Sequence, residues 1–285
     1  MGIFFRISAC LGLILLFSSP LSCSRSKSGD TEAFSGILNI KKELDSAFET
    51  GVPDREFISR LEDVMCNSGL PDHLIIRLRE ISFANPDFFN DLFLCLEEDF
   101  HLRELVDKQH PLPAVYIPLD LTALADSSYL VGRAGLMLRR DAAAALEKMA
   151  EAAKADGVTL VAASAYRSYD YQEMVYNRNV LEMGREAADR ESALPGHSQH
   201  QTGLSVDFGP IDDSFAVSTA GRWTAENAFR FGWSLSYPDG YEEITGYRWE
   251  SWHFRYVGKN LIAFINQYFD GIQQYALRFL HEWEK

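Results

Sequence analysis

Two short segments that lie far apart in the sequence carry most of the chemistry-bearing residues of this chain. The first covers residues 195–207 (PGHSQHQTGLSVD) and the second covers residues 249–255 (WESWHFR). Together they supply imidazoles, a carboxylate that can bind a metal ion and a second carboxylate that is free to act as a base. A catalytic zinc site needs three protein ligands, an open position for water and a general base beside it. A chain that uses these residues in one site has to fold so that the two segments meet.

The spacing within each segment sets a condition on the local backbone. An odd number of positions separates His200 from Asp207, so on one straight strand their side chains would point to opposite faces. Gly203 lies between them and lets the chain turn, which would bring both side chains to one metal ion. Glu250 and His253 have the same parity, and a bulge or bend between them would be needed. From spacing alone, histidines with a purely structural role remain the alternative to a metal site.

Four blocks of sequence, in this order, resemble the VanY-type zinc D-alanyl-D-alanine carboxypeptidases. The blocks are residues 164–168 with Gln172, residues 195–207, residues 237–238 with 244–246, and residues 250–258. The resemblance extends from about residue 112 to residue 257 and onward into the last predicted helix, and it does not cover residues 31–107. It implies the hedgehog/DD-peptidase fold.

The resemblance also implies which residues hold the metal. His200, Asp207 and His253 would bind Zn²⁺. Glu250 would be the base that activates water and then protonates the leaving amine. Zinc itself would lower the pKa of water from ~15.7 towards ~7, so that hydroxide is available at neutral pH. His197 is the alternative to His200 as a ligand, and the family register favours His200.

Further matching positions would contact the substrate. Arg167 would face the scissile carbonyl oxygen and stabilise the oxyanion, as a fixed cation can. The alternative is that Arg167 simply pairs with an acidic neighbour. Ser198 and Gln172 are weaker candidates, for holding the terminal carboxylate or the peptide groups of the substrate.

Four positions depart from the family pattern. The family commonly has Glu where Gln199 stands, Ala where Ser205 stands and Pro where Ser251 stands, and an arginine often precedes the Tyr-Pro pair where this chain has Ser236. None of these changes removes a ligand or the base. Loss of the proline could loosen Glu250, and loss of the arginine could alter contacts with the substrate.

The function implied by the resemblance is that of an exported zinc carboxypeptidase that removes the terminal D-alanine from peptidoglycan stem peptides. One alternative is an L,D-carboxypeptidase or an endopeptidase on the same fold, because loops build the specificity pocket. The other alternative is a non-catalytic wall-binding lipoprotein. A binding protein would not need to keep all five residues of the site, and this chain has all of them: His200, Asp207, His253, Glu250 and Arg167. The formal net charge of −14 argues against nucleic acid as a partner, because such binding depends on neutralising phosphates.

The N-terminus is typical of a targeting segment. Residues 1–22 are predicted to form a signal peptide, with Arg6 as a short basic region and an apolar run at residues 7–17 that is too short to span a bilayer. Cys23 stands where a bacterial lipoprotein would carry its lipid, and residues 23–30 form a polar tether. We therefore expect an exported protein of the periplasm or cell envelope, anchored to the membrane through lipid at Cys23. An ordinary cleaved signal with an incidental cysteine is the alternative.

Hydrophobic periodicity and turn signals predict a mixed fold after the tether. Strands are expected at residues 158–163, 203–208, 233–237 and 244–257, and helices at residues 140–157, 169–185 and 260–283. This order favours an α+β fold with a mainly antiparallel sheet flanked by helices. Residues 31–108 are predicted to form a small helical N-terminal region, and residues 109–285 the catalytic domain. Cys66 and Cys95 lie in helical patterns, where they could form a disulfide or remain two buried thiols.

Overall fold

The structure is a computed structural model that describes residues 55–85 and 87–285. The predicted signal peptide, the polar tether and the lipidation site Cys23 lie outside these residues. Among the residues that the structure describes, no helix combines the length and the apolar character needed to span a membrane.

The predicted α+β fold with a mainly antiparallel sheet is confirmed. The central sheet has five strands in the order β2 (Leu130–Val131), β4 (Val161–Ser164), β5 (Ser205–Phe208), β7 (His253–Tyr256) and β6 (Trp233–Leu235). The pair β2–β4 is parallel, and the other three pairs are antiparallel. A second sheet pairs β1 (Leu121–Ala123) with β3 (Met137–Arg139). In this order, β5 and β7 are neighbours, and each has another strand on its other side.

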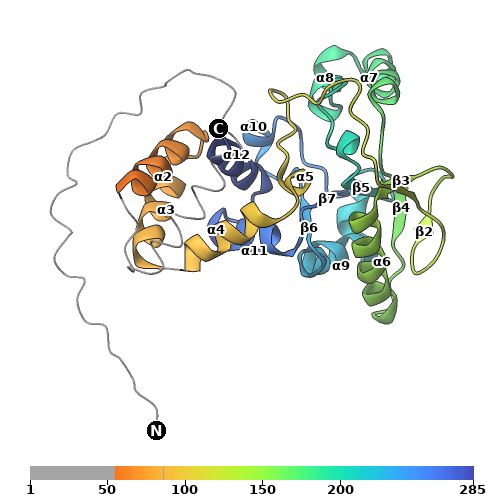
Figure 1. The fold of residues 1–285 in the computed structure, drawn as a ribbon. Helices are drawn as coiled ribbons and strands as arrows, with labels where there is room; N and C mark the ends of the chain where they lie inside the picture. Colours follow the sequence, from red (N-terminus) through yellow and green to blue (C-terminus); the bar gives the residue numbers. More distant parts are fainter. Residues whose placement is uncertain (1–54, 86) are drawn as a thin grey trace, which may run out of the picture.

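Helices flank this sheet at both ends (Figure 1). Helices α7 (Tyr169–Met183) and α8 (Arg185–Glu191) lie at the top of the view, and α6 (Arg140–Ala155) and α9 (Thr219–Asn227) lie at the bottom. Helix α6 turns an alanine-rich apolar stripe towards the sheet, where Leu146 and Met149 are fully buried against Val206 and Phe208 in one core. The apolar residues of α6 recur at helical spacing, which explains why the sequence pattern predicted this helix.

A second core joins the two ends of the described chain. It contains side chains of α2 (Arg55–Asn67), α3 (Asp72–Ala84) and α4 (Asp87–Glu97), followed in the chain by the short helix α5 (Phe100–Arg103), and of the C-terminal helices α11 (Lys259–Tyr268) and α12 (Gln273–Trp283). The rings of Phe57 and Trp283 lie 5.4 Å apart within it. Figure 1 shows these helices together on the side opposite to α7 and α8.

The prediction of one terminal helix over residues 260–283 was wrong. The helix stops at Tyr268 and restarts at Gln273, because Asp270 and Gly271 both have positive φ angles, of 55° and 74°. The break folds α12 back towards α11, with which it shares the second core. The Asp270-Gly271 pair is a local turn signal, and the prediction missed it because the apolar pattern continues on both sides of it.

One further expectation differs from the structure, and the structure decides one alternative that the sequence left open. Residues 244–257 do not form one strand, because α10 (Glu242–Thr245) occupies the start, a left-handed Gly246 ends it, and only His253–Tyr256 is extended. Cys95 is a free, buried thiol, so the Cys66–Cys95 disulfide does not form. The remaining short elements are the 3₁₀ helices η1 (Gln199–Thr202), η2 (Asp213–Val217) and η3 (Ala228–Phe231).

Candidate active site

Asp207 and His253 are direct cross-strand partners in the middle of the sheet. In the antiparallel pair β5–β7, Asp207 lies opposite His253. Residues that face each other in this way project to the same side of the sheet. The His253 Nδ1 atom accordingly lies 3.0 Å from Asp207 Oδ1. Strand pairing therefore brings together the two sequence segments that the predicted site requires.

His200 reaches the same place through a local reversal of the chain. It belongs to η1, and Gly203 directly after this helix adopts a left-handed conformation with φ of 71°. A Cβ atom at Gly203 would stand 2.9 Å from Leu121 Cδ2 and 3.0 Å from Arg139 Cγ, so these two side chains would have to shift to admit another residue. The turn brings His200 Nε2 to 3.1 Å from Asp207 Oδ2. It is the turn at Gly203 that the sequence predicted.

His200, Asp207 and His253 form a buried group whose ligand atoms all lie within 4.8 Å of one another. The second nitrogen of each imidazole contacts an oxygen acceptor outside the group. His200 Nδ1 lies 2.8 Å from the Ala165 carbonyl, and His253 Nε2 lies 3.4 Å from Gln199 Oε1. Such outer contacts place the ring hydrogen away from the metal side and leave the other nitrogen free to bind.

The arrangement fits a cation better than it fits an ion pair between the side chains. Burial and the nearby Arg167 lower the pKa of His200 to about 4, so its imidazole is neutral at physiological pH. A neutral ring that donates through Nδ1 aims the lone pair of Nε2 at a carboxylate oxygen. Asp207 Oδ1 is itself buried without a hydrogen-bond partner. Two nitrogens and one oxygen around a shared point are a ligand set of catalytic zinc sites, which keep a further position open.

Glu250 lies beside this group without belonging to it. Its Oε2 atom is 3.6 Å from His253 Nδ1. The predicted bend between Glu250 and His253 is present, as a turn at Ser251 and Trp252 that ends where β7 begins. Burial, followed by the charge of Asp207, raises the pKa of Glu250 well above its ordinary value. A carboxyl group with a raised pKa can accept and return a proton near neutral pH.

Arg167 extends into the same pocket and contacts Asp207. Its Nη2 donates to Asp207 Oδ2 over 2.7 Å and to Ser164 Oγ over 2.9 Å. The acidic neighbour that the sequence left as an alternative is therefore the aspartate of the candidate metal group. Gln172 accepts from Arg167 Nη1 over 3.4 Å and donates to the Ala193 carbonyl over 2.8 Å. This contact links the guanidinium to the wall of the pocket.

Ser198 and His197 have different surroundings. Ser198 lines the pocket and caps η1, because its Oγ accepts from His200 N over 3.3 Å. His197 is not part of the metal-binding group. Its Nδ1 lies 2.8 Å from the Asp107 carbonyl oxygen, so the ring joins the loop before η1 to the segment that leads from the N-terminal helices.

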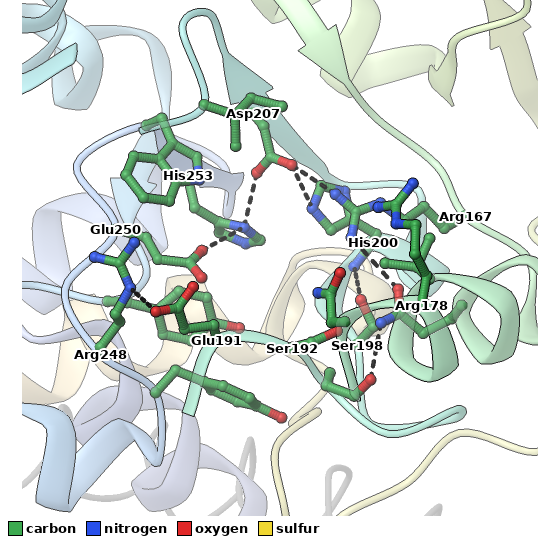
Figure 2. A pocket seen from close by; sticks show the side chains of 18 residues that line it. Arg167, Arg178, Glu191, Ser192, Ser198, His200, Asp207, Arg248, Glu250 and His253 are labelled. Carbon is green, nitrogen blue, oxygen red and sulfur yellow. Dashed lines mark hydrogen bonds and ion pairs between the residues drawn. The ribbon is translucent and has the colours of Figure 1, made fainter. Parts of the chain in front are cut away.

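The pocket has a charged rim that sequence reasoning missed (Figure 2). Arg178 from α7 and Glu191 from α8 line it, together with Arg248. Arg248 contacts Glu191 over 3.0 Å and Asp213 over 2.8 Å, and its guanidinium stands over the Trp252 ring. In the sequence, Arg178 and Glu191 cannot be distinguished from ordinary charged residues on the exposed face of a helix. The only available signal was that Arg248 directly precedes the segment 249–255, which carries Glu250.

A largely antiparallel sheet with a buried His–Asp–His group and a separate glutamate in one pocket defines a metallopeptidase. Residues 135–259 match the family model VanY, D-alanyl-D-alanine carboxypeptidase. The YodJ protein of Bacillus subtilis (strain 168) is 35% identical over 190 residues, which cover 62% of this chain and 70% of that protein. The chain belongs to the VanY family of D-alanyl-D-alanine carboxypeptidases.

Solved structures agree with this assignment. The structure of the LdcB LD-carboxypeptidase is similar with a TM-score of 0.52 and 35% identity, covering 59% of this chain and 85% of that chain. A mutant of the vancomycin resistance D,D-pentapeptidase VanY in complex with Zn(II) is similar with a TM-score of 0.50 and 34% identity, covering 60% of this chain and 96% of that chain. The fold and the family expected from the sequence blocks are thereby confirmed.

Proposed function

We propose that this protein is a zinc-dependent D,D-carboxypeptidase that removes the terminal D-alanine from peptidoglycan stem peptides. The observation that carries the proposal is the buried group of His200, Asp207 and His253 with Glu250 beside it in an open pocket. His200 Nε2, His253 Nδ1 and a carboxylate oxygen of Asp207 would hold the zinc ion. Zinc would supply a Lewis acid that makes water more acidic and polarises the scissile carbonyl.

Glu250 is the group in this site that can move a proton. It is close to the ligands without being one of them, and its raised pKa suits a carboxylate that alternates between charged and neutral forms. We assign to it the removal of a proton from the attacking water. The same proton then passes to the amine of the leaving D-alanine as the peptide bond breaks. Water thus supplies the hydroxyl group of the new carboxylic acid, which ionises to the carboxylate, and one hydrogen of the released amine.

Arg167 is a cation of the pocket that lies directly beside the candidate metal group, in contact with Asp207. Its contact with Asp207 and Ser164 holds the guanidinium in the pocket before substrate arrives. We assign to it the stabilisation of the oxyanion, for which preorganised donors are the most effective. Ser198 and Gln172 line the same pocket and are proposed to contact the carboxylate or peptide groups of the substrate.

The main alternative is cleavage of an L,D bond. The LdcB LD-carboxypeptidase and the D,D-pentapeptidase VanY resemble this chain to almost the same degree. The decisive experiment is mass spectrometry of defined tri-, tetra- and pentapeptide stems incubated with the zinc-loaded protein. Loss of one D-alanine from the pentapeptide alone is the expected result. Shortening of the tetrapeptide would instead assign the L,D activity. Tight binding of stems without any cleavage would assign a binding protein.

We further propose that the protein acts outside the cytoplasm and is anchored through lipid at Cys23. The support is the apolar run at residues 7–17 followed by a cysteine and a polar stretch, together with a substrate that lies in the cell wall. Labelled fatty acid is expected to enter the wild-type protein and not the Cys23→Ser variant, with Cys95→Ser as the matched control. Equal release of wild-type and Cys23→Ser protein in soluble form would contradict the anchor.

A further inference from the structure

Three buried polar side chains form a closed ring of hydrogen bonds behind His253. The Ser236 hydroxyl donates to Gln199 Oε1 over 2.7 Å, Gln199 Nε2 donates to Gln273 Oε1 over 3.3 Å, and Gln273 Nε2 donates to Ser236 Oγ over 3.3 Å. Each of the three side chains is at most 3% exposed. The ring joins η1, the residue after β6 and the first turn of α12.

Gln199 connects this ring to the candidate metal site. Its Oε1 atom lies 3.4 Å from His253 Nε2, on the side of the imidazole that faces away from Asp207. A carbonyl oxygen only accepts hydrogen bonds, so this contact favours the tautomer with its hydrogen on Nε2. That tautomer leaves the lone pair on Nδ1, and Nδ1 is the atom that lies 3.0 Å from Asp207 Oδ1.

The ring could in principle run in either direction, because each glutamine amide can rotate by half a turn. In the reverse direction the amide nitrogen of Gln199 would face His253 Nε2. Nε2 would then have to accept a hydrogen bond, and the ring hydrogen would move to Nδ1. An imidazole that carries a hydrogen on Nδ1 cannot bind a metal ion through that atom. The direction of the three-residue ring is therefore coupled to the ability of His253 to act as a ligand.

We propose that Gln199 is a positioning residue for the metal ligand His253, and that Gln273 and Ser236 hold its amide in the productive direction. This inference rests on the proposed zinc site. It extends the metal centre to α12, which otherwise belongs to the second core together with the N-terminal helices. The helical part of the protein would then contribute to metal affinity, although none of its described residues belongs to the candidate metal group.

The ring contains two of the four positions that depart from the family pattern. The family commonly has an acid at position 199 and a base at position 236, and in this chain the two positions touch through Gln199 and Ser236. A neutral acceptor holds the imidazole without a buried charge, which would need a partner of its own.

The experiment measures the zinc dissociation constant by competition with a chromogenic chelator. The variants are Gln199→Met and Gln273→Met, which keep the length of the side chain and remove its hydrogen bonds. For Gln199→Met we expect zinc binding weaker by about 10–100-fold, the usual effect of losing an outer partner of a metal ligand. For Gln273→Met we expect a smaller loss, because Ser236 still donates to Gln199.

The matched control is Gln274→Met on the same turn of α12. Gln274 is equally buried and donates to Asp107 Oδ2 over 2.6 Å, but it does not belong to the ring. Its replacement is expected to lower the melting temperature and to leave zinc affinity unchanged. Thermal unfolding of each metal-free variant shows whether it is folded. If Gln199→Met does not fold, Gln273→Met decides the question.

Wild-type zinc affinity in a folded Gln199→Met variant would overturn the inference. An equal loss of affinity in Gln274→Met would also overturn it, because the effect would then be general loosening of α12. The readout is metal affinity and not turnover. A wild-type protein that binds zinc and cleaves no stem peptide would contradict the proposed function and would leave this comparison intact.

Discussion

His253 Nδ1 lies 3.0 Å from Asp207 Oδ1 because the two residues face each other across the antiparallel strands β7 and β5. Their approach depends on the register of the sheet and not on a flexible loop. A shift of one residue would turn one of the two side chains to the other face. The hydrophobic residues beside them, Val206 and Phe254, are also paired and buried, and they fix the register.

Removal of the carboxylate should empty the metal site. We expect Asp207→Ala to bind zinc more weakly by more than the ~10–100-fold that loss of an outer partner costs, and to lose nearly all activity. The carboxylate supplies one of three protein ligands and the only negative charge among them. Metal analysis of the purified protein measures this, with Asp239→Ala in an exposed turn as the control. Full zinc occupancy in Asp207→Ala would show that the ligand assignment is wrong.

Removal of the proposed base should leave the metal in place. Glu250→Gln keeps the size of the side chain and cannot accept a proton, so we expect release of D-alanine to slow by about 10²–10⁴-fold or more. Zinc content and affinity for the stem peptide should change far less. Glu243→Gln, at an exposed position of α10, is the matched control. A Glu250→Gln variant that cleaves at the wild-type rate would rule out the proposed mechanism.

Replacement of Arg167 should lower kcat more than it raises KM. Arg167→Lys keeps the charge and loses the planar fork that contacts Asp207 and Ser164 together. Removal of a preorganised donor to an oxyanion typically costs about 10²–10³-fold in kcat. Steady-state kinetics on the pentapeptide stem measures the two constants separately, and Arg140→Lys on the exposed start of α6 serves as the control. A change confined to KM would assign Arg167 to substrate binding instead.

Acid should weaken the segment that precedes the catalytic domain. Burial raises the pKa of Asp107, but hydrogen bonds from His110 and Gln109 outweigh it and hold the pKa at about 2. The folded state therefore favours the charged form, and its stabilising effect of about 2 kcal/mol is complete above the unfolded pKa of ~3.9 and is lost as the pH falls towards 2.

The variant Asp107→Asn tests this. Chemical unfolding from pH 7 to pH 2 should show a lower stability at neutral pH and a weaker dependence on pH below about 5, since the group that titrates has been removed. Asp126→Asn, at an exposed site, corrects for the general effect of losing one charge. Identical pH profiles for the wild type and Asp107→Asn would contradict the role of this carboxylate.

Much of the site could be predicted because the backbone bends that it needs depend on neighbouring residues in the sequence. Gly203 solves the parity problem between His200 and Asp207 within a few residues, and a turn before His253 does the same for Glu250. A glycine between two candidate ligands is visible in the sequence and marks a place where the chain is able to turn. The order of the four blocks likewise identified the family before any contact was known.

The sequence by itself determined which segments carry the chemistry and which local bends they need, because these depend on neighbouring residues. Only the tertiary structure decided the Asp207–His253 register and the contact of Gln273 with Gln199. These arise from packing between parts of the chain that are far apart in sequence. No short sequence pattern encodes such contacts, because each of the two residues is compatible with its own helix or strand whether or not the other residue is nearby.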